Sequence, residues 1–322
     1  MKAQNYITTK LQELKQPLGL PKFSGQDLEN EIVRLILSKK FRKYTANDDL
    51  VKHIKQVVHL ALEKNEPINF TFLHGAYKLW RLDEAPETDW AELFSLMYYS
   101  KWVKPICEIY EPGVWFDFFV DDIVIEKLDN LDHSEVQAYI ESYQTIIDFL
   151  KPYQPDNLKM TITPVSSQFK SENDFWQSIE KNLATINVDG LPVLTDGQRA
   201  MVELNVRPTD EQLRDDKWQE KVYQLHNAYM MTKGEPGYHK ERPDKILVFT
   251  QPLPSGTTIS VGTTKNSIMK FWIGIGVLKP KSESFEMTVL SPNQLSETSF
   301  DFEDISLDGL SGKNFKKIRI IK

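Results

Sequence analysis

The chain is poor in cysteine, because Cys107 is the single one among 322 residues. One cysteine excludes an intrachain disulfide and any metal site that needs several thiolates. Cys107 lies in a predicted helical run between apolar neighbours, which favours a buried structural thiol over a nucleophile. The lack of disulfides is typical of a reducing compartment, and we therefore expect a cytoplasmic location.

Several signature motifs are also missing. The sequence contains no Gly-x-Gly-x-x-Gly, no Gly-Lys-Ser/Thr, no Gly-x-Ser-x-Gly and no His-Glu-x-x-His. Nicotinamide binding, ATP binding through a Walker loop, serine hydrolysis and zinc peptidase chemistry therefore lack their usual support. The six histidines are scattered singly, which does not indicate a histidine-rich metal site.

No run of eighteen apolar residues occurs, and the first residues lack the apolar core of a signal peptide, so we expect no membrane association. The net charge of -7 argues against an extended nucleic-acid surface. A local basic pocket remains compatible with that charge. Lys39, Lys40, Arg42 and Lys43 gather at the end of a helix predicted over residues 27–44, where a solvated helix terminus explains them and phosphate binding is the alternative.

Residues 67–150 carry the clearest structural pattern. Ile68, Phe70 and Phe72 alternate with polar residues, which predicts a strand that stops at Gly75. Asp89, with Glu92 three residues later, predicts the capped start of a helix. An aromatic and β-branched run over residues 114–120 predicts a second strand. Strand, helix and strand together indicate a parallel βαβ crossover.

The remaining patterns extend this unit into an α/β fold: a mixed, mostly parallel, Rossmann-like sheet flanked by helices, with a helical N-terminal region and a β-rich C-terminal part. We expect a helical region at 1–65, a catalytic core at 66–298 and a peripheral tail at 299–322. Helices are predicted over residues 132–150, 175–183 and 198–232, the last with a possible break at Arg207-Pro208 and a second helix over residues 210–231. Strands are predicted over residues 160–165, 245–250, 257–261, 267–278 and 285–290.

Candidate site residues follow from this arrangement. Asp121 and Asp122 end a predicted strand, where open α/β sheets place ligands, although a polar strand end explains them equally well. Lys78 follows Gly75, with a snorkelling lysine as the alternative. Two later segments could hold an anion: residues 237–245, which include Tyr238 and Arg242, and residues 255–267, which include Lys265. A β-hairpin with a threonine-rich solvent face is the alternative for the latter segment.

The central stretch resembles a known family. Residues 70–78, 89–92, 110–113 and 131–139, together with Asp121, follow the order and much of the spacing of the isonitrile (isocyanide) synthases of the Pvc/Dit type, the pyoverdine/dityrosine biosynthesis protein family. The interval from Pro112 through Asp121 to Tyr139 matches without gaps. Residues 238–242 and 267–271 look similar only loosely.

The resemblance implies an enzyme of secondary metabolism that needs no metal and no cofactor. It would join the α-amino group of an amino acid to ribulose 5-phosphate and fragment the sugar, so that one carbon stays on nitrogen as the isonitrile. An iron/2-oxoglutarate oxygenase could then act on the product. The residues implied for proton transfer and oxyanion stabilisation are Asp121, Glu92 and Tyr238, and those implied for holding the substrates are Lys78, Arg242, Lys265, His74, Ser267 and Lys270.

Two other functions fit the residues. Asp121 and Asp122 could hold a divalent metal for a transferase that acts on a phosphate-bearing donor. A non-catalytic binding module with the same fold is the third hypothesis.

Overall fold

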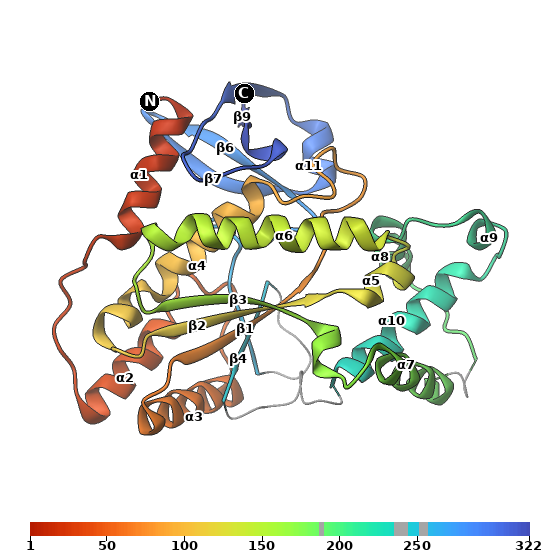
Figure 1. Cartoon of the computed structure of the whole chain (residues 1–322), viewed down its shortest axis with the longest axis horizontal. Helices are drawn as coiled ribbons and strands as arrows, with labels where there is room; N and C mark the ends of the chain where they lie inside the picture. Colours follow the sequence, from red (N-terminus) through yellow and green to blue (C-terminus); the bar gives the residue numbers. More distant parts are fainter. Residues whose placement is uncertain (187–189, 235–243, 251–256) are drawn as a thin grey trace.

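A computed structural model of the chain describes residues 1–186, 190–234, 244–250 and 257–322. The fold is α/β, as the sequence predicts (Figure 1). Five parallel strands form the larger sheet in the order β3-β2-β1-β4-β5, and a smaller mixed sheet has the order β7-β6-β9-β8. Among the described helices, none combines the length and the apolar run needed to span a bilayer.

Three helices precede the larger sheet: α1 (Ala3–Lys15), α2 (Gly25–Ile36) and α3 (Asp48–Lys64). The predicted crossover is confirmed, because β1 (Ile68–Gly75) pairs in parallel with β2 (Val114–Asp121), and α4 (Trp90–Ile109) connects them. Asp89 and Glu92 form the predicted reciprocal cap at the start of α4. The register pairs Gly75 with Asp121, so both strands end at the same level.

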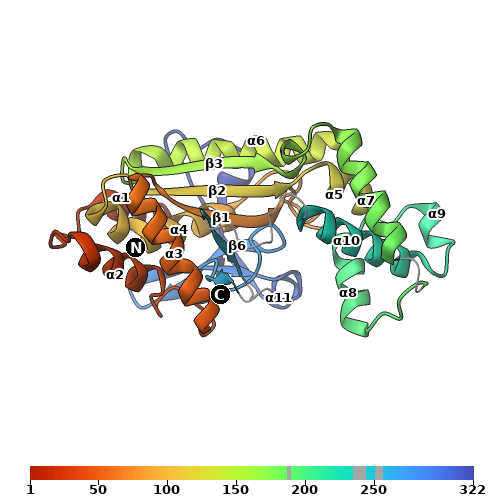
Figure 2. The ribbon, with the colours of Figure 1, turned by 90° about the horizontal axis from the view of Figure 1, so that it is seen from below.

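The chain first adds strands on one side of β1 and then returns to the other side. After β2 come α5 (Ile123–Leu128), α6 (His133–Leu150), the short helix η1 (Lys151–Tyr153), β3 (Leu158–Pro164) and η2 (Val165–Gln168). The next helices, α7 (Glu172–Ile186), α8 (Asp196–Asn205), α9 (Asp210–Leu213) and α10 (Trp218–Gly234), lie beyond the carboxyl ends of the strands (Figure 2). β4 (Ile246–Phe249) then pairs with β1, which makes the β1–β4 boundary the point where the strand order reverses.

β5 (Thr258–Ser260) completes the larger sheet. The smaller sheet contains β6 (Ile275–Lys281), β7 (Ser284–Leu290), β8 (Phe300–Asp304) and β9 (Lys317–Ile321), with α11 (Pro292–Glu297) and η4 (Lys313–Phe315) between them. β9 lies between β6 and β8, so the last residues are in the interior of this sheet. Both chain ends lie at this sheet (Figure 1).

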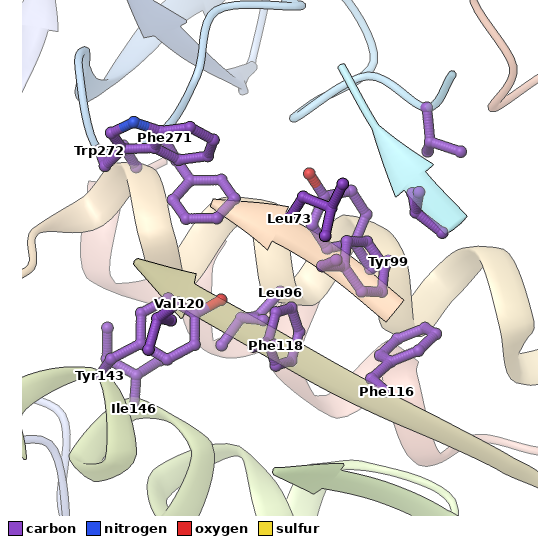
Figure 3. Close-up of a cluster of buried hydrophobic side chains, with 14 of the residues drawn as sticks. Leu73, Leu96, Tyr99, Phe116, Phe118, Val120, Tyr143, Ile146, Phe271 and Trp272 are labelled. Atoms are coloured by element: carbon purple, nitrogen blue, oxygen red, sulfur yellow. The ribbon is translucent and has the colours of Figure 1, made fainter. Parts of the chain in front are cut away.

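Aromatic rings fill the space between the larger sheet and helices α4 and α6 (Figure 3). Phe72 on β1 stacks on Phe118 of β2 at a centroid distance of 4.9 Å, and Tyr99 of α4 lies 4.6 Å from Phe72. Tyr143 rises from α6 to contact Phe118 at 5.3 Å. Cys107 is buried at the far end of α4, and burial raises the pKa of its thiol to about 12, which agrees with a structural role.

Three local predictions were wrong. The helix expected over residues 27–44 ends at Ile36, because the backbone of residues 41–43 pairs with residues 260–262 instead. The strand expected over residues 267–278 begins only at Ile275, and residues 270–274 form a turn closed by the Lys270 carbonyl. The alternative given for residues 255–267, a hairpin whose threonines face solvent, is also wrong, since Thr257, Thr258, Thr263 and Thr264 are at most 4% exposed.

Candidate functional site

A cavity of about 270 Å³ opens at the carboxyl ends of β1, β2 and β4. The strand ends contribute Leu73, His74, Gly75, Asp121 and Phe249 to its wall. Helices α5, α8 and α10 close it from the opposite side, as their position beyond the strand ends indicates (Figure 2). Ligands of open α/β sheets bind at such a reversal of strand order, so we take this cavity as the candidate active site.

Glycine at the end of β1 lets two aromatic residues approach the backbone. A Cβ atom on Gly75 would lie 2.4 Å from Cε1 of Tyr77 and 3.2 Å from Nε1 of Trp272. The first distance is too short for a Cβ atom unless the Tyr77 ring moves, and the second is tighter than most Cβ contacts. Tyr77 and Trp272 therefore form a fixed aromatic wall beside the strand end, and both line the cavity.

Asp121 is held by the helical cap. It is the last residue of β2, and its Oδ1 atom accepts a hydrogen bond from the hydroxyl of Tyr229 on α10. Val222, His226 and Tyr229 recur at helical spacing on α10, and all three line the cavity. The arrangement places a carboxylate, an imidazole and a phenol around one space.

A second acid lines the same cavity as Asp121. Asp129, at the end of α5, is 6% exposed and lines the cavity. Burial, reinforced by the charge of Asp121, raises the pKa of Asp129 well above its usual range. Burial and the two acids also raise the pKa of Tyr77, whose hydroxyl donates to Oδ1 of Asn205 at 3.0 Å. The site therefore holds a proton on Asp129 more readily than an ordinary aspartate would.

One cation reaches the cavity from the turn before β6. The ammonium of Lys270 lies 5.3 Å from the ring centroid of Phe249 and 5.6 Å from that of Trp272. Such cation–π contacts hold an ammonium in place over a ring face. Lys270 and Asp121 thus both line the cavity and bring opposite charges to it.

His74 is also deeply buried, at 2% exposure. Its Nδ1–H donates to the Gly75 carbonyl oxygen at 3.0 Å, and its ring stacks on Tyr143 at 5.2 Å. Phe271 and Trp272 pack at 5.1 and 5.5 Å from it. The labelled side chains of Figure 3 show how these aromatic residues gather at the strand ends. His74 therefore joins the aromatic core to the cavity.

Lys78 and Glu92 lie outside the cavity wall, in a closed ionic cluster. The Lys78 ammonium donates to Asp89 at 2.7 Å, to both Glu92 oxygens at 3.1 Å and to the Phe271 carbonyl at 2.8 Å. The side chains of Lys78 and Glu92 are 0% exposed. We expected Lys78 to hold a phosphate, but its ammonium is enclosed in this cluster. The N–H donors of the ammonium are already used by acceptors within the fold.

The cluster contains more acid than base. Burial raises the pKa of Glu92 to about 8, with Lys78 opposing that shift and Asp89 adding to it. The Tyr139 hydroxyl donates to Glu92 Oε1 at 3.2 Å. A single lysine thus faces two buried carboxylates, which is why one of them holds its proton to higher pH.

The other expected residues are placed elsewhere. Lys265 is exposed and Ser267 donates to the Val289 carbonyl at 2.8 Å, and neither lines this cavity. Asp122 turns away from Asp121 and accepts from the backbone and side chain of Ser166. Tyr238 and Arg242 lie outside the described residues. No three His, Cys, Asp or Glu side chains in the described ranges are grouped to hold a metal ion.

Sequence reasoning named Asp121, His74 and Lys270, which all line this cavity. It missed the lining residues that the helices contribute. Asp129, Asn205, His226 and Tyr229 all come from helices whose position over the strand ends is not encoded locally. One signal was available on α10. His226 lies on the same face of α10 as Val222 and Tyr229. A titratable residue on a packed helix face is a candidate for a functional site.

Comparison with known proteins supports the fold. No protein-family profile and no curated protein matches the chain. Among solved structures, the crystal structure of the PvcA protein from Pseudomonas aeruginosa is similar, with a TM-score of 0.62 and 14% sequence identity. The similarity covers 92% of this chain and 100% of PvcA. At that identity the likeness shows a shared fold.

Proposed function

We propose that the protein is an isonitrile synthase-like enzyme that acts on the α-amino group of an amino acid, with ribulose 5-phosphate as the carbon donor. One observation supports this most strongly: Asp121 and Lys270 line one cavity at the strand-order reversal. The resemblance of residues 112–139 to the Pvc/Dit-type synthases and the fold likeness to PvcA favour the same chemistry.

The cavity suits the steps that this reaction requires. Imine formation between an amine and a ketone releases water and needs repeated proton transfers, for which Asp121 and the proton-retaining Asp129 are placed. Lys270 would bind the substrate carboxylate or phosphate. Tyr77 and Trp272 would contact the amino-acid side chain. The volume of about 270 Å³ fits a molecule of amino-acid size.

A direct assay tests the proposal. The purified protein is incubated with pooled amino acids and ribulose 5-phosphate, and the product is detected by its isonitrile infrared band or by reaction with a tetrazine. We expect a product with the natural chain, and a loss of roughly 10²- to 10⁴-fold in rate for Asp121→Asn, because a general base is removed.

Asp148→Asn is the matched control, since Asp148 is an exposed aspartate on α6, away from the cavity. It should keep the natural rate. The proposal fails if the natural chain makes no isonitrile from any amino acid, or if Asp121→Asn turns over as fast as Asp148→Asn.

A further inference from the structure

A second and larger cavity lies against α4. Its volume is about 670 Å³, and its walls come from α1, α4, residues 38–41 and the β6–β7 hairpin. Within the described ranges, the residues that line this cavity and those that line the candidate active site do not overlap. Figure 1 shows α1 and the β6–β7 hairpin side by side near the amino end of the chain, and contacts join both of them to α4. We call this space the α1–α4 cavity.

Its rim is basic although the chain is acidic. Two glutamates, Glu13 and Glu286, oppose a group of lysines, so the lining carries four more positive than negative charges, whereas the whole chain has a net charge of -7. The lysines of the lining are Lys10, Lys40, Lys101, Lys104, Lys265 and Lys281. Such a local reversal of charge attracts anions.

Lys104 is the buried member of this group. It is 7% exposed, and its ammonium donates to the backbone carbonyl of Glu13 at 2.6 Å. In the described part of the chain no carboxylate lies within 4.0 Å of it. Glu13 pairs with Lys10 at 2.6 Å, and Glu108, the other acid that acts on Lys104, accepts from the backbone N–H groups of Leu18 and Leu20. Burial lowers the pKa of both Lys101 and Lys104. A desolvated ammonium with one neutral acceptor is stabilised when an anion binds beside it.

The wall between the lysines is apolar. Phe41, Phe94, Met97 and Trp102 are buried side chains that line the cavity, and Phe285 is half-buried opposite them. The Trp102 indole is fixed by a hydrogen bond from Nε1 to the Ile36 carbonyl at 3.2 Å. A hydrocarbon chain that packs on this wall would be transferred out of water, which is favourable, and would displace no polar contact.

We propose that the α1–α4 cavity binds an amphipathic monoanion, a carboxylate attached to a medium or long hydrocarbon chain. The carboxylate would pair with Lys104 and Lys101, and the chain would lie on Phe94, Met97 and Trp102. The volume is within the usual range for small-molecule sites. This site is separate from the candidate active site and does not depend on the function proposed above.

Isothermal titration calorimetry with dodecanoate, below its micelle-forming concentration, tests the proposal. We expect one dodecanoate per chain, at least roughly tenfold weaker binding of hexanoate because less hydrocarbon is buried, and similarly weaker binding of dodecanol because the charge is absent. Lys104→Met should weaken dodecanoate binding by roughly tenfold or more, since it keeps the length of the side chain and removes its charge.

Lys101→Ala, a change at a side chain that is 48% exposed, should also weaken binding. Lys55→Met is the matched control, because Lys55 is an exposed lysine on α3 that does not line the cavity. It should bind as the natural chain does. The proposal is overturned if dodecanol binds as tightly as dodecanoate, if Lys101→Ala and Lys55→Met bind alike, or if dodecanoate does not bind at all.

Discussion

At the scale of single residues, the cluster of Lys78, Asp89 and Glu92 shows how the fold holds charge next to the candidate site. Removing one partner from a buried ionic group leaves an uncompensated charge, which costs about 3–5 kcal/mol. Lys78 also fixes the Phe271 carbonyl, and the next residue, Trp272, lines the cavity. The cluster therefore holds the turn that carries Trp272 to the cavity.

The pH dependence of stability should reveal the cluster. The pKa of Glu92 is about 8 in the folded chain and near 4.5 when unfolded, so between these values the folded state binds more protons. The contribution of Glu92 to the free energy of unfolding is therefore fully present below about pH 4.5. It decreases as the pH rises toward 8, by at most about 1.4 kcal/mol per pH unit. Glu92→Gln should remove this slope, measured as the free energy of unfolding in urea from pH 5 to 9.

Glu141→Gln is the control for that series, because Glu141 is an exposed glutamate on α6. Its curve should run parallel to that of the natural chain, whereas the Glu92→Gln curve should diverge with rising pH. Parallel curves for all three proteins would show that Glu92 titrates normally.

At the scale of secondary-structure elements, β6 packs closely on the start of α4. A Cβ atom on Gly276 would lie 2.3 Å from the Ala91 nitrogen and 2.3 Å from the Trp90 carbonyl carbon. The Gly276 N–H also donates to Oδ2 of Asp89 at 3.2 Å. This contact joins the smaller sheet to the helix that carries the ionic cluster.

Gly276→Ala should therefore destabilise the fold by about 1–3 kcal/mol or more, because backbone atoms cannot yield as a flexible side chain would. The measurement is the midpoint of thermal unfolding. Gly197→Ala is the matched control: a Cβ atom there meets nothing within 4 Å, and the residue lies in α8. That change should leave stability the same or raise it by up to about 1 kcal/mol. Equal midpoints for the two variants would contradict the packing argument.

The same scale shows what the sequence could predict. The βαβ unit was predictable because its signals are local: alternation over residues 68–72 and the reciprocal cap of Asp89 and Glu92. The end of α2 could not be predicted from local signals, because residues 41–43 pair with a segment more than 200 residues away. The turn before β6 was missed for a similar reason, since the Phe271 carbonyl turns to meet Lys78.

For the site, strand ends were the informative positions. Asp121 could be predicted because the carboxyl ends of parallel strands meet at one edge. His74 was expected only from the resemblance to the isonitrile synthases. Lys265 was expected beside them and lines the α1–α4 cavity instead. No local pattern tells which of two cavities a loop lysine faces, because that depends on how the smaller sheet docks on α4.

At the scale of the whole molecule, the last 24 residues contribute more to the stability of the fold than a peripheral tail would. β9 is an inner strand of the smaller sheet, with Ile318 and Ile320 buried. Phe315 packs edge-on against Trp90 at 5.3 Å, and the Trp90 indole donates to the Lys317 carbonyl at 2.8 Å. Burial of each such side chain contributes about 1.5–3 kcal/mol.

A chain that ends at residue 298 should therefore fail to fold stably, because the lost burial is of the same order as the net stability of a typical protein, about 5–15 kcal/mol. Circular dichroism and solubility measure the outcome. A full-length chain with a protease site inserted after Thr298 provides the control, since the cleaved tail should stay bound through its strand pairing and come off only in denaturant. A soluble 1–298 chain with the natural melting temperature would show instead that residues 299–322 are the dispensable appendage that their sequence suggests.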